Sequence, residues 1–215
     1  MFPTSVRAPR AKFAAITLGL ILVNLYFFWQ EIMAPDTEIF IEQFALIPAK
    51  ISFSHLSDLT PFLSAQFLHA GLVHLVSNMW FLYLFGPNLE KALGKIPFLI
   101  FYLVSGAFGF FLQFLFLADS AIPMLGASGA VAGILGGFLV FYPKARVNVL
   151  VPVFPLFFPL PFPAQVMLIY WFVTQLFSGV ASVVAETAVT GGVAWWAHVG
   201  GFGAGYLLSK IWPFK

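Results

Sequence analysis

The sequence contains no cysteine and very little charge. Without cysteine, the chain cannot form disulfides, thiolate metal sites or a cysteine nucleophile. Charged residues make up 8% of the 215 residues, whereas a soluble domain carries about 25% because its surface must face water. Hydrophobic residues make up 61%, and the mean hydropathy is +0.97. These values exclude a soluble globule and predict a single membrane domain over residues 1–215.

The sequence also lacks the features that nucleic-acid binding and two kinds of intramembrane protease site require. The net charge is only +2, so the dense basic face that nucleic-acid binding requires is absent. The sequence has no His-Glu-x-x-His zinc motif and no aspartate pair inside an apolar stretch. We therefore expect no nucleic-acid partner, no metal and no cofactor, and we expect the bilayer to be the main surrounding of the chain.

Six apolar stretches are long enough to cross a bilayer as helices, which takes about 17–25 residues. A transmembrane barrel would instead show alternating strands of about ten residues, and these stretches are continuously apolar. The sequence therefore predicts an all-α polytopic membrane protein, a bundle of six transmembrane helices. The stretches cover residues 13–29, 70–89, 97–118, 125–142, 164–185 and 192–209.

The charges are sorted between the two sides that this six-helix arrangement defines. All ten basic residues except Lys50 lie in the connections on one side, together with both termini. All eight acidic residues except Glu90 lie on the other side. Because basic connections stay in the cytoplasm, we expect a cytoplasmic N-terminal tail over 1–12 and a cytoplasmic C-terminus.

Two connections are unusual. Residues 31–69 alternate aromatic or aliphatic positions with polar ones, which predicts a long first loop embedded in the membrane interface rather than spanning it. Residues 143–163 are apolar but contain six prolines, too many for a lipid-exposed helix. We expect the second segment to be an extended loop resting on the cytoplasmic membrane surface.

Polar residues stand near the start of three predicted helices. They are His74 and Asn78 in the second, Ser128 in the fourth and His198 in the sixth. All three helices run in the same direction, and each polar site lies within about two turns of the same end. Polar groups at membrane depth cost free energy, so their presence there indicates a function. Their common depth predicts a single buried chamber that opens to the outer side.

A serine beside a histidine is a nucleophile with its general base. Small residues at four-residue spacing let two helices approach closely in lipid, and such stripes adjoin both Ser128 and His198. No acidic residue lies within a predicted helix, so we expect a Ser–His dyad whose imidazole is positioned by packing alone. The two stripes are Gly129, Gly133 and Gly137, and Ala197, Gly201 and Gly205.

His74 and Asn78 are one helical turn apart and share a face. Both can donate hydrogen bonds, as the stabilisation of an oxyanion requires, and the backbone amide of Ser128 would add a third donor. The alternative is a structural role, in which His74 and Asn78 only form hydrogen bonds between helices. The remaining polar residues, Asn24, Gln113 and Gln175, are interpreted as hydrogen-bond partners between helices.

Together these motifs resemble the rhomboid intramembrane serine proteases over residues 60–210. Each motif alone is weak, but their order and depth are specific to that family. The matching residues are His69-x4-His74-x3-Asn78 with Gly86-x3-Glu90, then Gly126-Ala-Ser128-Gly129, and Ala197-His198-x2-Gly201-x3-Gly205.

The resemblance implies that Ser128 is the nucleophile, His198 the base, and His74, Asn78 and the Ser128 amide the oxyanion hole. It implies that helix 164–185 and loop 186–191 are the gate and cap for single-spanning membrane protein substrates. The resemblance is to the bacterial type with six helices, which implies a bacterial inner (plasma) membrane location. Some relatives stack a tyrosine on the catalytic histidine where this chain has Ala132. We therefore expect Trp195 or Trp196 to hold the ring.

Two alternatives remain open. A pseudoprotease of the same fold would bind membrane proteins without cutting them, although inactive relatives usually lack the serine or the histidine. A transporter would use charged intramembrane residues and internal repeats, and neither is found.

Overall fold

The fold comes from a computed structural model that describes residues 2–153, 156–184 and 193–211. It confirms the predicted helical membrane bundle, because each of the six apolar stretches contains a helix. The helix ends differ from the predicted ones by at most four residues. The six helices are α1 (Ala15–Met33), α4 (Leu72–Leu93), α5 (Lys95–Phe116), α6 (Ser128–Phe141), α7 (Ala164–Val184) and α8 (Trp195–Ile211).

The six helices differ in how well they fit a membrane span by themselves. Within the described residues, α1, α5 and α7 are long and apolar enough to cross a bilayer. Helix α4 joins them if it counts as one span with residues 56–67, from which it is bent by 87°. Helix α6 is apolar but has only 14 residues. A helix enclosed by other helices does not have to match the bilayer thickness, because its ends meet protein rather than lipid.

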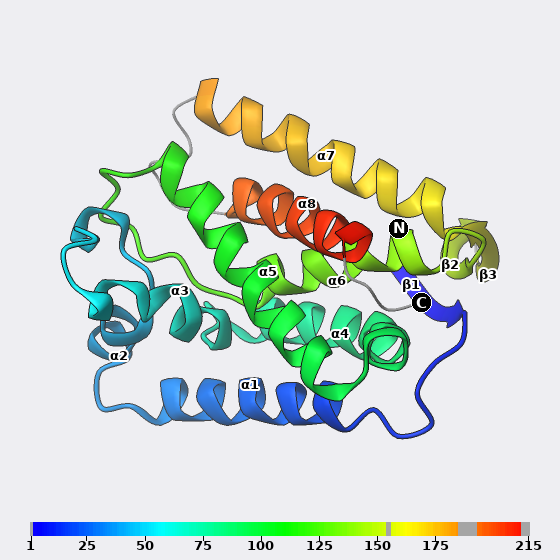
Figure 1. The fold of residues 1–215 in the computed structure, drawn as a ribbon, viewed down its shortest axis with the longest axis horizontal. Helices are drawn as coiled ribbons and strands as arrows, with labels where there is room; N and C mark the ends of the chain where they lie inside the picture. The colour runs from blue at the N-terminus through cyan, green and yellow to red at the C-terminus, as the bar shows by residue number, and fades with distance from the viewer. Residues whose placement is uncertain (1, 154–155, 185–192, 212–215) are drawn as a thin grey trace.

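Helix α6 forms the centre of the bundle. Figure 1 shows α7 on one flank and α1 on the opposite flank, with α5, α6 and α8 between them. Each residue of α6 from Gly129 to Phe138 is buried. A Cβ atom on Gly201 or Gly205 of α8 would overlap the backbone of α6. The small-residue stripes thus bring α6 and α8 into backbone contact, as predicted.

The long first loop folds into short helical segments against the bundle. Asp36 caps the first of them by accepting hydrogen bonds from two backbone amides. Leu46 and Met124 then exchange two backbone hydrogen bonds, which attach the loop to the segment before α6. The segments are α2 (Thr37–Phe44), η1 (Pro48–Lys50), η2 (Leu56–Leu59), α3 (Pro61–Ser64) and η3 (Ala65–Phe67).

The structure corrects the prediction of an extended loop over 143–163. This segment forms the hairpin of β2 (Arg146–Val153) and β3 (Leu156–Pro163), and β1 (Phe2–Arg7), from the predicted tail, pairs with β2. The antiparallel order is β1-β2-β3, so β3 is an edge strand. Its prolines stand at alternate positions in the ladder, where a missing N–H can face away from the neighbouring strand.

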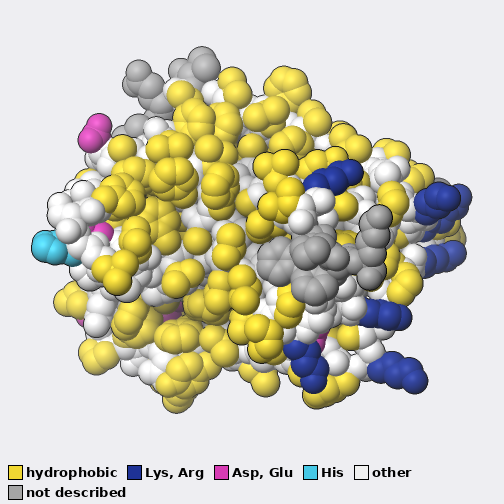
Figure 2. All heavy atoms as spheres, viewed as in Figure 1, with side chains coloured by type: hydrophobic (Ala, Val, Ile, Leu, Met, Phe, Trp, Pro, Cys, Tyr) yellow, Lys and Arg dark blue, Asp and Glu magenta, His cyan; other side chains and the backbone are white. Residues whose placement is uncertain are grey.

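Charged side chains are also distributed unevenly in space. Figure 2 shows Lys and Arg gathered at the end of the molecule that carries the sheet. Two acids, however, are buried within helices, contrary to the prediction that none would be. The Glu90 carboxylate on α4 accepts hydrogen bonds from the Ile16 and Thr17 amides, at 3.0 and 2.8 Å, and so caps α1. Glu31 on α1 accepts one from the His69 amide, at 3.1 Å.

Candidate active site

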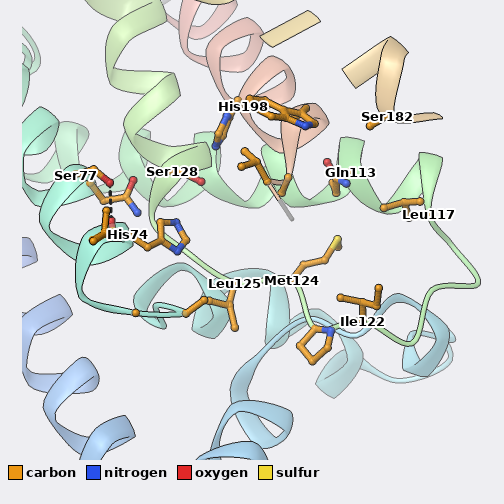
Figure 3. Close-up of a pocket in the computed structure, with 18 of the residues that line it drawn as sticks. His74, Ser77, Gln113, Leu117, Ile122, Met124, Leu125, Ser128, Ser182 and His198 are labelled. Carbon is orange, nitrogen blue, oxygen red and sulfur yellow. Dashed lines mark hydrogen bonds between the residues drawn. The ribbon is translucent and has the colours of Figure 1, made fainter. Parts of the chain in front are cut away.

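A cavity of about 920 Å³ collects the polar residues of the predicted chamber. Its lining includes His74 and Asn78 from α4, Ser128 from α6 and His198 from α8. Figure 3 shows these helices converging on the hollow, with the His198 ring and the Ser128 hydroxyl facing it. The structure therefore brings together side chains that lie up to 124 positions apart in the sequence, as the common depth predicted.

Ser128 is placed by the segment that precedes it. It is the first residue of α6, and the Gly126 amide two residues earlier donates a hydrogen bond of 2.8 Å to the Ala65 carbonyl of the long loop. Gly126 has φ of +123°, and a Cβ there would lie 2.8 Å from His74 Nε2. Both facts require glycine at this position. The long loop thus fixes the turn that presents the serine.

Three hydrogen-bond donors lie near the serine. Asn78 is only 6% exposed, and its buried Nδ2 has no hydrogen-bond partner within the part of the chain that the structure describes. A buried amide left without a partner is costly, so a group that accepts from it would be bound favourably. His74 lies one turn earlier on the same helix and lines the same cavity. The Ser128 amide belongs to the first turn of α6, where N–H groups lack partners within the helix.

The His198 ring has a polar partner, which corrects the prediction that packing alone would position it. Its Nδ1 lies 2.7 Å from the side-chain oxygen of Gln175 on α7. Trp195 lies edge-on to the ring at 6.2 Å between centroids. The ring of Trp171 on α7 lies at 5.8 Å and is tilted by 32°. Trp196, the other residue expected to hold the ring, instead stacks on Phe116 at 3.9 Å.

No hydrogen bond joins Ser128 to His198 among the described contacts, although both line the cavity. Catalytic hydrogen bonds are often long in free enzymes and tighten in the complex with substrate. With Nδ1 engaged by Gln175, the other ring nitrogen, Nε2, is the one available to the serine. The arrangement can therefore perform nucleophilic catalysis if the two groups close on a substrate.

The other polar residues have structural contacts. The Gln113 side-chain oxygen accepts from the Ala197 amide at 3.1 Å and so links α5 to α8, as predicted. Asn24 donates to the Leu20 carbonyl of its own helix at 2.7 Å, and its side chain also interacts with that of Tyr102 on α5, an interhelical contact as predicted. His69 ties the long loop to α1 through Glu31, and its ring meets His74 edge-on at 5.1 Å. The described residues contain no group of three or more metal-ligating side chains.

Comparisons with known proteins show which family the chain resembles. A family model described as the Rhomboid domain matches residues 56–212. Rhomboid protease AarA of Providencia stuartii is 29% identical over 230 aligned positions, which cover 96% of this chain and 76% of that protein. RHOMBOID-like protein 4 of Arabidopsis thaliana is 35% identical over 149 residues, 69% of this chain. The mitochondrial RHOMBOID-like protein 6 of the same plant is 44% identical over 77 residues, 36% of this chain. The chain spans a third of the length of the first plant relative and about a quarter of the second.

Proposed function

Because the chain belongs to the rhomboid family, we propose that this multi-pass membrane protein is an intramembrane serine endopeptidase. It cuts the transmembrane segments of single-spanning membrane proteins near the outer face of the bilayer. The observation that carries the proposal is the cavity that Ser128, His198 and Asn78 share. It joins a hydroxyl, an imidazole and a buried amide donor that has no hydrogen-bond partner among the described residues.

The proposed reaction passes through an acyl-enzyme. The Ser128 hydroxyl attacks the scissile carbonyl while His198 Nε2 takes its proton. His74, Asn78 and the Ser128 amide donate hydrogen bonds to the resulting oxyanion. The tetrahedral intermediate then expels the amine, which takes the proton from His198. A water molecule, deprotonated by His198, hydrolyses the ester and regenerates the serine.

The substrate has to expose its peptide bond before this attack. In a transmembrane helix each carbonyl is bonded to an amide four residues on, which shields it from a nucleophile. Helix-breaking glycine or proline in the substrate would release the carbonyl, so we propose specificity for segments that unwind easily. Helix α7 is the proposed gate. The proposed cap, 186–191, lies outside the described residues.

We also propose the orientation and location of the enzyme. The basic end that Figure 2 shows carries the sheet, and basic connections remain in the cytoplasm. We therefore place both termini in the cytoplasm and the catalytic cavity towards the outside of a bacterial inner membrane. We propose that residues 1–215 form one membrane domain, with a rhomboid core over about 60–210.

The decisive experiment compares wild type with Ser128→Ala and His198→Ala on a fluorogenic transmembrane substrate, together with a serine-directed fluorophosphonate probe. We expect wild type to cut and to be labelled, and both variants to be silent. Ser209→Ala is the matched control, because the described hydrogen bond of this buried serine goes to the Gly205 carbonyl of its own helix, at 2.8 Å. Equal cleavage by all the proteins would overturn the mechanism. If wild type is neither labelled nor active, a binding-only protein is favoured.

A second prediction tests the oxyanion hole. Asn78→Ala should lower kcat by about 10²–10³-fold, the usual cost of removing one such donor. The KM should change much less, because the bond forms mainly in the transition state. Steady-state cleavage rates check this. An Asn78→Ala enzyme as fast as wild type would remove Asn78 from the proposed site.

A further inference from the structure

Gln175 is the only described polar side chain of α7 that contacts the imidazole of His198. It is 7% exposed, although α7 is an outer helix with much of its surface uncovered. The seam between α7 and α8 also holds apolar pairs, such as Phe172 stacked on Phe202 at 4.7 Å. Burying a glutamine in such a seam costs free energy unless both ends of its amide form hydrogen bonds. The partners of Gln175 therefore show what its amide does there.

The hydrogen-bond network determines which end of the amide faces the histidine. The Thr174 hydroxyl donates to the Trp171 carbonyl at 2.6 Å, so its oxygen is left as an acceptor. The Gln175 NH₂ group donates to that oxygen at 3.3 Å. The Gln175 carbonyl therefore faces Nδ1 of His198, at 2.7 Å.

A carbonyl can only accept, so Nδ1 of His198 must carry the proton. In the neutral imidazole, Nε2 is then the lone-pair nitrogen, which is the form a general base needs. Among the described residues that line the cavity, none is acidic, and His74 from α4 is the one other titratable side chain that faces it. The amide of Gln175 thus occupies the place that a carboxylate has in a triad.

We propose that Gln175 is the positioning residue of the general base, and that it holds His198 in the Nδ1–H tautomer from the gate helix. This inference rests on the proposed function. Because the acceptor belongs to α7 and the base to α8, the correct tautomer is secured only while these two helices lie together. Displacement of α7 removes the acceptor and leaves the ring free to change tautomer and to rotate.

The test uses two substitutions at one position. Gln175→Leu keeps the volume but removes the acceptor. It should lower both kcat and the rate of fluorophosphonate labelling by about 10–10²-fold, taking as a guide the loss of the orienting partner of a metal-bound histidine. KM should change less than kcat. Gln175→Glu keeps an acceptor and should restore most of the rate. Its pH–rate profile should move to higher pH, because a carboxylate stabilises the imidazolium and delays the return of the neutral base.

The comparison variant is Gln113→Leu. Gln113 is also buried and also reaches α8, but it accepts from a backbone amide rather than from the imidazole. We expect it to lose thermal stability without any shift in the pH–rate profile. If Gln175→Leu labels within twofold of wild type, the proposal is wrong. It is also wrong if the Leu and Glu variants lose rate equally with unshifted profiles.

A measurement without activity separates this proposal from the proposed function. Nitrogen-15 NMR of the purified protein reports which ring nitrogen of His198 is protonated, and the signal is assigned by its loss in His198→Ala. We expect Nδ1–H in wild type and a mixture of tautomers in Gln175→Leu. A wild-type Nε2–H signal overturns the positioning role even if the protease is active. Failure of wild type to label at Ser128 overturns the protease while leaving the tautomer result to stand.

Discussion

Helices α6 and α7 both pack on α8, but they do so by different means. On the α6 side, glycines let the two backbones touch, and no side chain separates Gly201 from the Gly129 carbonyl. On the α7 side, aromatic rings fill the seam, as in the stack of Phe172 on Phe202. Backbones in contact cannot slide without overlap, whereas rings can turn and repack. The serine therefore stands on the rigid seam, and the orienting partner of the histidine stands on the adaptable one.

The largest effect should come from a side chain inserted into the α6–α8 seam. Gly205→Val places methyl groups against the Gly133 carbonyl, which cannot move without moving the helix. We expect a loss of about 3 kcal/mol or more, and a fall in Tm of roughly 6–12 °C for a chain of this size. Thermal unfolding in detergent micelles measures it.

Gly203→Val is the control for this substitution. It makes the same change on the same helix, at a position where nothing lies within 4 Å of an added Cβ. We expect its Tm to stay within a few degrees of that of wild type. An equal fall in Tm at the two positions would show that valine destabilises α8 itself. It would contradict the conclusion that the seam between α6 and α8 is rigid.

A middle-sized effect is expected from the α7–α8 seam. Phe172→Ala removes the ring that stacks on Phe202. Burial against lipid contributes little to helix association, so the loss should be close to the worth of the aromatic pair, about 1 kcal/mol.

Spin labels can show where that change acts. The chain has no cysteine, so labels go only to introduced sites. Phe177→Cys and Leu207→Cys, both exposed, report the separation of α7 from α8, and Leu115→Cys with Leu207→Cys reports that of α5 from α8. Phe172→Ala should broaden the first distance distribution and leave the second unchanged. Broadening of both would contradict an adaptable α7 on a rigid remainder.

The smallest effect is expected at Gly179 of α7. A Cβ there would lie 3.1 Å from the nearest atom of the Trp196 ring, so the ring must shift by a few tenths of an ångström. Alanine is the better helix former by about 1 kcal/mol, which offsets the crowding. We expect Gly179→Ala to change the Tm by less than roughly 3 °C. A loss as large as that of Gly205→Val would mean that both seams are equally rigid.

The sequence predicted the parts of the fold that depend on local composition. Continuous apolar stretches gave the six helices, and glycines at four-residue spacing identified α6 and α8 as partners. The polar residues at a common depth predicted the shared cavity. Their roles as nucleophile, base and oxyanion donors remain predictions that the proposed substitutions test.

Two features were missed for physical reasons. The partner of His198 depends on which face of α7 meets α8, and a helix that is apolar all round does not encode that face. Gln175 was therefore predicted only as a hydrogen-bond partner of an unspecified helix.

The hairpin was missed because the number of prolines indicates irregular structure, whereas their positions are compatible with a strand. Pro159, Pro161 and Pro163 alternate with other residues, which is the pattern an edge strand tolerates.

The small sheet also has a consequence for the order of assembly during synthesis. Strand β1 pairs with β2, and Thr4 bonds to Asn148, 144 positions later. At about 5–20 residues per second, a ribosome needs roughly 7–30 s to make that length of chain. Strand β1 therefore has no β2 to pair with while four of the six bundle helices are made. The sheet therefore forms only after β2 has been made, and it joins β1 to the hairpin that leads into α7.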